Sequence, residues 1–156
     1  MHIEKAVSTD YENVLGLFKE LDDFHADIDP ARVQRHEGVA RTKEEFLRYV
    51  EGEDAVLFFC IVDDEIVAFA NAIFIEVKKD RFKVGRKYVL LDNLYVNMKH
   101  RRKGIGMTLY QRIRDWAFSS GTSNIEIQVF WGNEEAKAFY KKIGFKSLSI
   151  RMGSNA

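Results

Sequence analysis

The sequence is poor in the features that mark secreted, membrane-spanning or multidomain proteins. Its one cysteine, Cys60, excludes an intrachain disulfide framework, and the apolar run around it predicts a buried, inert thiol. Pro30 is the only proline, and no proline-rich linker or internal repeat marks a domain boundary. No stretch approaches the ~18 apolar residues of a membrane span, and residues 1–7 lack a signal-peptide core. We therefore expect a cytoplasmic protein with no membrane partner.

An excess of charge of either sign is also missing. The 156 residues include 24 basic and 24 acidic side chains, which gives a formal net charge of +0. A dedicated nucleic-acid binder takes its affinity from excess basic residues, so this balance argues against a nucleic-acid partner. With 46% hydrophobic residues, the chain is long enough for one compact core and short for two. We expect residues 1–156 to form a single domain.

The spacing of apolar residues predicts a mixed α/β fold. Helical spacing follows Thr9-x-x-Glu12 and Thr42-x-x-Glu45, which both resemble capping boxes. The apolar runs 55–62 and 66–75 predict strands covered on both faces, and residues 88–96 predict a third strand. A helix beginning at Ile105, a strand over 125–130, a helix ending before Gly144 and a last strand over 145–152 complete the pattern. This order predicts a mixed sheet with helices on both faces.

A basic turn, Arg101-Arg102-Lys103-Gly104-Ile105-Gly106, joins a predicted strand to a predicted helix. Glycines let the backbone approach an anion, and the following helix presents free N–H groups and the positive end of its dipole, so such a turn suits phosphate. The same basic residues could instead be a solvated charge run or a localisation signal. The turn lacks the patterns of a Walker loop and of a dinucleotide fold, so neither ATP hydrolysis nor nicotinamide chemistry is the natural assignment.

Two motifs in this order resemble the GNAT superfamily of acetyl-coenzyme A dependent N-acetyltransferases, and among its members the small-amine acetyltransferases. The first motif is Leu94-Tyr95-Val96 followed by Arg101-x-x-Gly104-x-Gly106. The second is Asn133-Glu134-Glu135-Ala136-x-Ala138-Phe139-Tyr140-x-x-x-Gly144-Phe145. His25-x-x-x-x-Pro30 adds weak support, and the short stretch after Phe145 departs from the family. The resemblance implies a single-domain fold with a mainly antiparallel central sheet.

The resemblance also implies acetyl-coenzyme A as co-substrate and a set of residues that hold it. The turn would hold the pyrophosphate, the strand before it would bond the pantetheine arm through its backbone, and an amide on the second motif would bond the same arm. These cofactor-binding residues are Leu94, Tyr95, Val96, Arg101, Arg102, Lys103, Gly104, Ile105, Gly106, Met107, Asn133 and Tyr140. Asn133 could also be a plain helix N-cap, and both roles can hold at once.

Tyr140 and Asp92 are the candidate catalytic residues. Tyr140 lies on a helical stripe with Phe139 and Ile143, which by itself favours core packing, but the matching tyrosine of the family donates a proton to the departing sulfur. Asp92 is a carboxylate within an apolar strand, which is costly unless it is paired, hydrated or functional. It is the candidate general base, acting directly or through a water. Glu126 is the second candidate, and its alternative is a solvent-facing strand residue.

The acceptor is expected to be an amine, either a small cationic molecule such as a polyamine or aminoglycoside, or a protein lysine or N-terminus. Carboxylates cluster between the first two helices, at Glu20, Asp22, Asp23, Asp27 and Asp29. They would attract a cation, although such runs are usually solvated surface. The scattered histidines give no metal-ligand set, so we expect no metal. A non-catalytic acyl-coenzyme A binding module is the alternative function, and a homodimer is possible.

Overall fold

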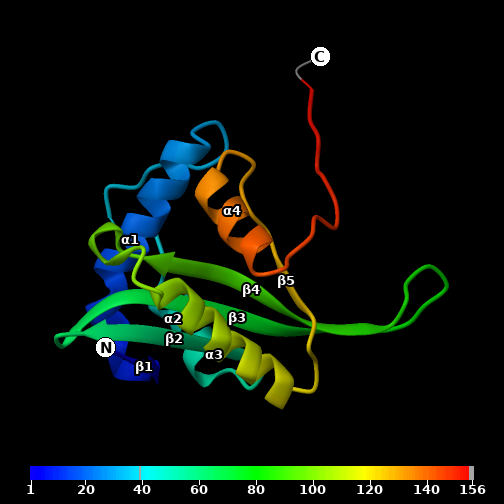
Figure 1. Ribbon diagram of the computed structural model, residues 1–156, viewed down its shortest axis with the longest axis horizontal. Coiled ribbons are helices and arrows are strands. Elements are labelled where there is room, and N and C mark those ends of the chain that lie inside the picture. The colour runs from blue at the N-terminus through cyan, green and yellow to red at the C-terminus, as the bar shows by residue number, and fades with distance from the viewer. Residues whose placement is uncertain (39, 155–156) are drawn as a thin grey trace.

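A five-stranded sheet forms the centre of the computed structural model, which describes residues 1–38 and 40–154. The strands are β1 (His2–Lys5), β2 (Ala55–Val62), β3 (Glu65–Val77), β4 (Arg86–Val96) and β5 (Ile125–Ile127), side by side in chain order (Figure 1). Neighbouring strands are antiparallel except β4 and β5, which are parallel. A parallel pair needs a crossover connection, and helix α3 (Ile105–Ser119) lies in it. The predicted mixed, mainly antiparallel sheet is confirmed.

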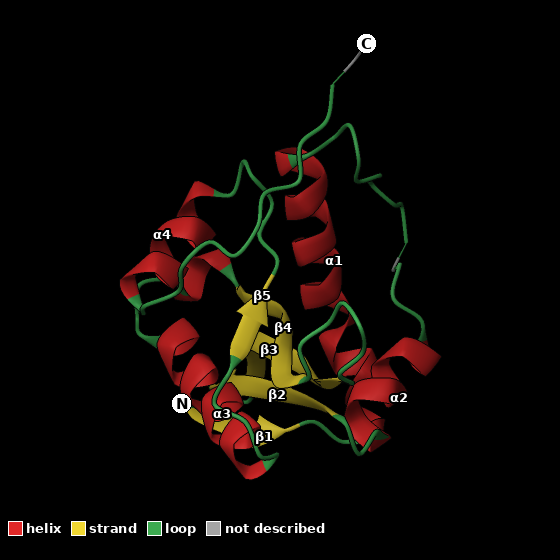
Figure 2. Cartoon of the chain, turned by 90° about the vertical axis from the view of Figure 1, so that its right-hand side faces the viewer, coloured by secondary structure: helices red, strands yellow, loops and turns green. Residues whose placement is uncertain are grey.

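Helices cover both faces of the sheet, as predicted. The helices α1 (Tyr11–Ile28) and α2 (Lys43–Glu51) pack on one face, and α3 and α4 (Glu134–Lys142) pack on the other (Figure 2). Alternate residues of β2 serve the two layers, since Leu57 and Phe59 are buried with α1 whereas Val56 and Cys60 are buried with α3. Burial on both sides explains why this strand is a continuous apolar run.

The helix α3 packs on the sheet through residues four apart. Ile105, Leu109, Ile113 and Ala117 are all buried, and this spacing keeps them on one face of the helix. The sequence predicts the first three, with Trp116 as the fourth, but Trp116 is only half-buried. The buried thiol of Cys60 lies in the same layer, where burial raises its pKa, in agreement with an inert cysteine.

Both ends of the described chain differ from the prediction. The apolar pattern misses β1, because a four-residue edge strand with one apolar residue, Ile3, carries little signal. The strand predicted over 145–152 is wrong, because residues 145–154 form neither helix nor strand. The alternating residues Leu148, Ile150 and Met152 are 75%, 67% and 89% exposed. Alternation alone does not make a strand without a neighbouring strand to pair with.

Two smaller predictions also fail. The strand predicted over 125–130 ends at Ile127, and Phe130 leaves the sheet to pack on the ring of His25, with ring centres 4.9 Å apart. The capping box predicted at Thr9 and Glu12 does not form. A short 3-10 turn, Ser8–Asp10, precedes α1 instead, and the side chain of Asp10 accepts the Val7 N–H at 2.8 Å.

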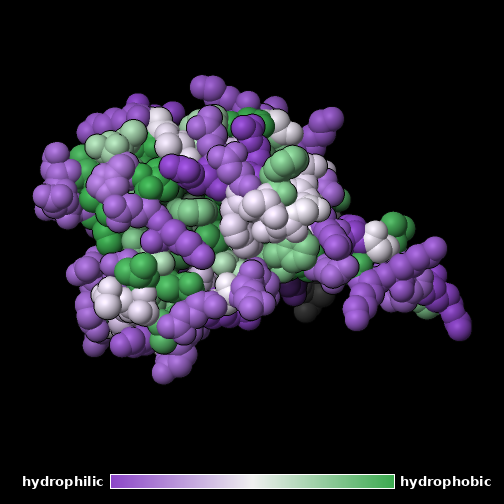
Figure 3. All heavy atoms as spheres, turned by 90° about the horizontal axis from the view of Figure 1, so that it is seen from below, coloured by the Kyte–Doolittle hydropathy of each residue, from purple (hydrophilic) through white to green (hydrophobic). Residues whose placement is uncertain are grey.

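The strands β3 and β4 continue beyond the body of the protein as a hairpin. Its loop, residues 78–85, is the projection on the right of Figure 1, and Figure 3 shows the same projection as a mostly hydrophilic arm. Its side chains include the exposed Phe82 and Val84. The backbone N–H groups of Phe82 and Lys83 both donate to Asp80 at 2.7 Å, which closes the turn.

The capping box at Thr42 and Glu45 is confirmed, and it gives a stability prediction. Glu45 N–H donates to the Thr42 hydroxyl at 3.2 Å, and Thr42 N–H donates to the Glu45 carboxylate at 2.7 Å. We expect Thr42→Ala to lower the free energy of unfolding by about 1 kcal/mol. The Glu45 N–H then loses its acceptor, and the reciprocal bond from residue 42 to the Glu45 carboxylate loses the contact that supports it. Thr42→Ser, which keeps the hydroxyl, should stay close to wild type. Equal urea midpoints for the two variants would contradict the prediction.

Candidate active site

The turn before α3 has the backbone geometry of an anion site. Arg102 and Gly104 both have positive φ, 62° and 81°, a backbone conformation that recurs in the concave turns whose N–H groups bind anions. The first bond back along the helix runs from Thr108 N–H to the Gly104 carbonyl at 3.0 Å. The N–H groups of Ile105, Gly106 and Met107 precede this bond and lie at the positive end of the helix dipole. This geometry suits a pyrophosphate.

The two glycines of the turn are needed for different reasons. Gly104 has room for a side chain, but its φ of +81° strains any residue that carries a Cβ. Gly106 has ordinary helical backbone, and a Cβ there would meet its nearest neighbours, Leu94 and Phe139, at 3.6 and 3.7 Å. These are normal contact distances, so the packing of the protein does not require glycine at position 106. A glycine at this position would, however, let a ligand approach the backbone closely.

Arg101 differs from its two basic neighbours. Its Nε donates to the Val96 carbonyl at 3.0 Å, and its guanidinium bonds the Glu135 carboxylate at 2.7 Å. The same group lies 5.6 Å from the centre of the Tyr95 ring. Arg101 thus ties the end of β4 to the start of α4. The side chain of Arg102 is 86% exposed and lies 3.5 Å from the same Glu135 carboxylate, and that of Lys103 is exposed as well. Both side chains thus stay at the surface, where a phosphate could meet them.

The strand β4 loses one of its neighbours at the point where the first motif begins. It pairs with β5 only at Val89, Leu90 and Leu91, whereas it pairs with β3 as far as Val96. On the β5 side, the backbone of residues 94–96 is therefore not part of a described ladder. A ligand arm can bond such an edge in the manner of an added strand. Leu94, Tyr95 and Val96 stay a predicted pantetheine site.

The side chain of Tyr95 is engaged away from this predicted site. The ring is buried under α1, and its hydroxyl donates to Glu20 at 3.2 Å. Burial, together with the neighbouring Glu20 carboxylate, raises the pKa of Tyr95 to about 12. The phenol therefore stays protonated near neutral pH and keeps its bond to α1.

Asp92 is the extra residue of a β-bulge. Asn71 of β3 pairs with Asn93 and the next residue, Ala72, pairs with Leu91, so Asp92 has no partner in the register. The bulge exchanges the two faces of the strand: Leu91 is buried with α3, whereas Tyr95, four residues later, is buried with α1. Without the bulge these two residues would share a face.

A cavity of about 450 Å³ lies beside Asp92, on the face of the sheet that carries α1 and α2. Besides Asp92 it is lined by four apolar residues, by Tyr49 and by five other polar or charged residues, namely Phe18, Phe46, Leu57, Ile73, Tyr49, Arg41, Glu45, Arg48, Asn71 and Asn93. A cleft with apolar walls and a few convergent polar groups is the usual form of a small-molecule site. The predicted cleft beside Asp92 is therefore present.

Tyr140 lies on the opposite side of the sheet. It is 6% exposed and packs edge-on against Phe139 and Phe145, with ring centres 5.1 and 5.3 Å away. Burial, and secondarily Tyr110, raises the pKa of Tyr140 well above its usual range, so the phenol remains a hydrogen-bond donor. Asn133 caps the helix that carries it, accepting the Ala136 N–H at 3.0 Å. The N-cap role of Asn133 is confirmed.

The other carboxylates proposed from the sequence are already paired. Glu126 lies 3.5 Å from Arg86 and does not line the cavity beside Asp92. In the acidic stretch, Asp22 bonds Arg41 at 2.9 Å, and Glu20 accepts from Asn97 and Tyr95. Basic side chains also pair with the rest of the stretch, which comprises Asp23, Asp27 and Asp29. Pairing reduces the field that these groups could exert on a cation.

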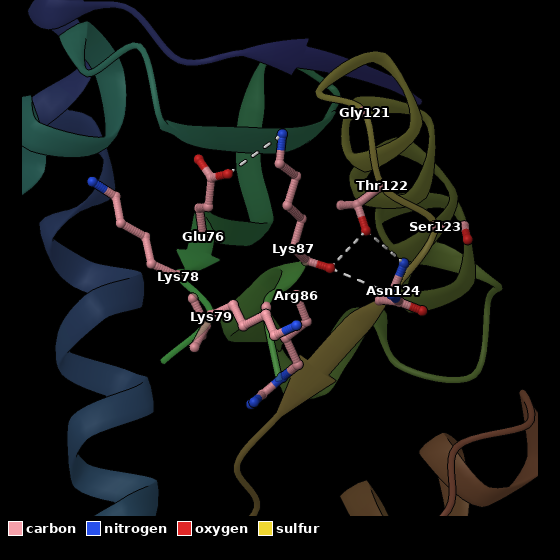
Figure 4. Close-up of a pocket in the computed structure, with 11 residues that line it drawn as sticks. Glu76, Lys78, Lys79, Arg86, Lys87, Gly121, Thr122, Ser123 and Asn124 are labelled. Carbon is pink, nitrogen blue, oxygen red and sulfur yellow. Dashed lines mark hydrogen bonds and ion pairs between the residues drawn. The ribbon is translucent and has the colours of Figure 1, made fainter. Parts of the chain in front are cut away.

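The larger cavity, about 660 Å³, lies far from these groups. It is at the root of the β3–β4 hairpin, next to the turn that follows α3. The glycine-containing turn of residues 101–106, by contrast, precedes α3. A helix of 15 residues, about 22 Å long, separates the two. Figure 4 shows the side chains of Lys78, Arg86 and Lys87 pointing in different directions, with Lys87 paired to Glu76. We assign no chemistry to this cavity.

Comparison with known proteins agrees with this geometry. The model of the acetyltransferase (GNAT) family matches residues 18–145, which is most of the chain. The chain belongs to the GNAT family. Acetyl-coenzyme A is the acetyl donor of these acetyltransferases. No helix within residues 1–38 and 40–154 is both long and apolar enough to cross a membrane.

Individual relatives are more distant. A Bacillus subtilis (strain 168) protein named as the uncharacterized N-acetyltransferase YobR is 36% identical over 59 residues, which span 38% of this chain and only 24% of that protein. A mutant form of the BH1408 protein from Bacillus halodurans has the same fold, with a TM-score of 0.93 and 24% identity over 100% of this chain and 99% of that one. The aminoglycoside N-acetyltransferase AAC(6')-Iy, solved with CoA, gives a TM-score of 0.73 and 17% identity over 99% and 98%.

Tyr49 and Asn71 are site residues that the sequence does not reveal. Both contact Asp92, yet they lie 43 and 21 positions before it in the chain. In the sequence, Tyr49 belongs to the apolar stripe of a short helix and Asn71 interrupts an apolar strand. A buried polar residue in such a strand is the one signal that could have been used, because it needs a partner.

A substitution at Gly106 tests whether the turn of residues 101–106 binds the pyrophosphate. We expect Gly106→Ala to weaken acetyl-coenzyme A binding at least tenfold while the free energy of unfolding changes little, because a Cβ fits the protein but occupies the ligand's approach. Gly16→Ala, in the open middle of α1, is the matched control and should bind as wild type. Calorimetry that gave the same affinity for both variants would exclude this turn as the pyrophosphate site.

Proposed function

We propose that this protein transfers the acetyl group of acetyl-coenzyme A to a primary amine, by direct attack within a ternary complex. The observation that carries the proposal is the arrangement around β4. A phosphate-type turn and Tyr140 lie with α3 and α4, whereas the cavity beside Asp92 lies with α1 and α2. The strand between them is β4, whose residues 94–96 have no β5 partner in the described ladder. Donor and acceptor would meet at this edge.

The residues that would hold the donor follow from the turn and the strand edge. Backbone N–H groups from Arg102 to Met107 would bind the pyrophosphate, with the exposed side chains of Arg102 and Lys103 adding positive charge. The backbone of residues 94–96 would bond the pantetheine arm. Asn133 uses its Oδ1 for the helix cap and keeps its amide N–H groups for the same arm. The thioester supplies an activated acetyl group.

Asp92 and Tyr140 would divide the proton chemistry. A primary amine has a pKa near ~10.4, so it arrives as ammonium and must lose a proton, which Asp92 would accept directly or through a water. The amine nitrogen then forms a bond to the acetyl carbon, and a backbone N–H stabilises the negative charge on the oxygen. The carbon–sulfur bond breaks, and Tyr140 gives its proton to the departing sulfur, whose thiol has a pKa of roughly 8.5. The second proton of the amine nitrogen then restores the phenol, directly or through a water.

Cationic amines are the proposed acceptors. The carboxylate of Asp92 in a partly apolar cavity favours a positively charged group. The fold is shared with a protein named as an aminoglycoside N-acetyltransferase, and this supports small cationic molecules ahead of protein lysines. The acidic stretch adds little, because its carboxylates are paired. The prediction that it lies between the first two helices is also wrong, since α1 continues to Ile28 and only Asp29 follows it.

A screen of amines tests the function. Purified protein with acetyl-coenzyme A should acetylate spermidine or an aminoglycoside, and Asp92→Asn should raise the pH needed for activity, because deprotonation then depends on solvent. Asp115→Asn, on the exposed side of α3, is the matched control and should leave the profile unchanged. Tight binding of acetyl-coenzyme A with no acetylated product from any amine would instead favour the non-catalytic binding module.

Tyr140→Phe tests the proton donor. The change keeps the packing of the ring but removes the hydroxyl, so we expect kcat to fall about 100-fold with little change in the affinity for acetyl-coenzyme A. Tyr88→Phe, at the root of the hairpin, is the control and should retain wild-type kcat. If chemistry limits the rate and Tyr140→Phe has an unchanged kcat, Tyr140 is only a packing residue.

A further inference from the structure

The two oxygens of the Asp92 carboxylate have different surroundings. Oδ2 accepts three hydrogen bonds, from the Tyr49 hydroxyl at 2.6 Å, the Asn93 amide at 3.1 Å and the Asn71 amide at 3.3 Å. Oδ1 accepts none from the residues that the structure describes. An ionised carboxylate has about four acceptor sites over its two oxygens, and Oδ1 uses none of its own. This asymmetry leaves one oxygen open to a ligand.

The three donors come from three different elements and meet in one cavity. Tyr49 lies on α2, Asn71 on β3 and Asn93 on β4, and all of them line the cavity beside Asp92. Asn71 is 3% exposed, and its nitrogen must face the carboxylate, because a carboxylate only accepts hydrogen bonds. Its own Oδ1 accepts no hydrogen bond from residues 1–38 and 40–154. A buried acceptor without a donor is rare in proteins and calls for an explanation.

The contact with Tyr49 is the strongest of the three by geometry. Hydrogen bonds from a hydroxyl to a carboxylate are short and about twice as strong as neutral ones, and 2.6 Å falls within their range. Burial, and then the hydrogen bond to Asp92, raise the pKa of Tyr49 well above its usual range, so its hydroxyl remains a donor at any pH at which the protein works.

The other charged groups that line the cavity are engaged elsewhere. Arg41 pairs with Asp22 at 2.9 Å, and Arg48 lies 3.8 Å from Asp54. Glu45 accepts the N–H of Thr42 in the capping box. Tyr49 is therefore the ionisable side chain of the cavity that contacts Asp92 directly.

We propose that Tyr49 is a positioning residue, which holds Oδ2 of Asp92 so that Oδ1 is presented to the acceptor amine. Asp92 lies at a bulge and is exposed to solvent. Without the hydrogen bond from Tyr49, its side chain could therefore rotate away from the cavity. The inference rests on the proposed role of Asp92 as the base. It gives α2, which packs mainly against β2, a further role, since its Tyr49 side chain reaches Asp92 on β4.

Kinetics of Tyr49→Phe, with spermidine and an aminoglycoside as acceptors, test the proposal. We expect kcat/KM to fall about tenfold, the loss typical of a hydrogen bond to a charged group. The acid limb of its pH profile should move to higher pH, because a carboxylate that loses a donor is less stable in its charged form. Adding Tyr49→Phe to Asp92→Asn should have little further effect, since the two residues act as a unit. Tyr88→Phe is the control.

The results separate this inference from the proposed function. If Asp92→Asn lowers activity while Tyr49→Phe behaves as Tyr88→Phe does, then the positioning role is wrong and the proposed base stands. If Asp92→Asn has full activity with an unshifted profile, then the proposed base is wrong and Tyr49 has no base to position. Equal losses from Tyr49→Phe with and without Asp92→Asn would also overturn the inference.

The contact itself can be tested without an acceptor. In wild-type protein the tyrosine Cζ resonance of Tyr49, assigned from Tyr49→Phe, should not titrate at the pH where exposed tyrosines ionise, near ~10. In Asp92→Asn it should titrate at lower pH than in wild type, because the phenolate no longer faces a carboxylate. An identical titration of Tyr49 in both proteins would show that the hydroxyl does not contact Asp92, and would overturn the proposal.

Discussion

The site depends on how β4 is paired. This strand keeps its antiparallel ladder with β3 to Val96 but loses its parallel neighbour β5 after Leu91, and a bulge at Asp92 adds one residue between these regions. The first irregularity leaves backbone groups unpaired at one edge. The second turns a carboxylate out of the ladder and exchanges the faces of the residues that follow. If β5 continued along β4 there would be no open edge, and without the bulge Asp92 would be a paired residue of the β3–β4 ladder.

The layers on the two sides of the sheet carry different parts of the candidate site. The phosphate-type turn and Tyr140 belong to the layer of α3 and α4, where Arg101 joins the end of β4 to Glu135 of α4. The cavity, Asp92 and Tyr49 belong to the layer of α1 and α2. Because both layers pack on the same continuous sheet, their distances from β4 are held by the hydrophobic core.

Much of the fold could be predicted because its signals are local. The apolar run of β2, the fourfold stripe of α3 and the capping box at Thr42 each depend on a few neighbouring residues. The failures depend on partners far away in the chain. Residues 145–152 alternate like a strand but have no described strand beside them, and β5 stops at Ile127, beyond which Phe130 packs on His25. A hydrophobic pattern cannot indicate whether a partner exists.

The amino-acid order by itself determined the phosphate-type turn, because its glycines, basic residues and helix start are contiguous, and it placed Asp92 and Tyr140 as candidates. Tertiary structure alone decided what surrounds them. It made Arg101 a link between β4 and α4, paired the acidic stretch with basic side chains, and brought Tyr49 and Asn71 onto one oxygen of Asp92. The physical reason is that a bulge and a contact 43 residues apart arise from packing and register, which no local pattern encodes.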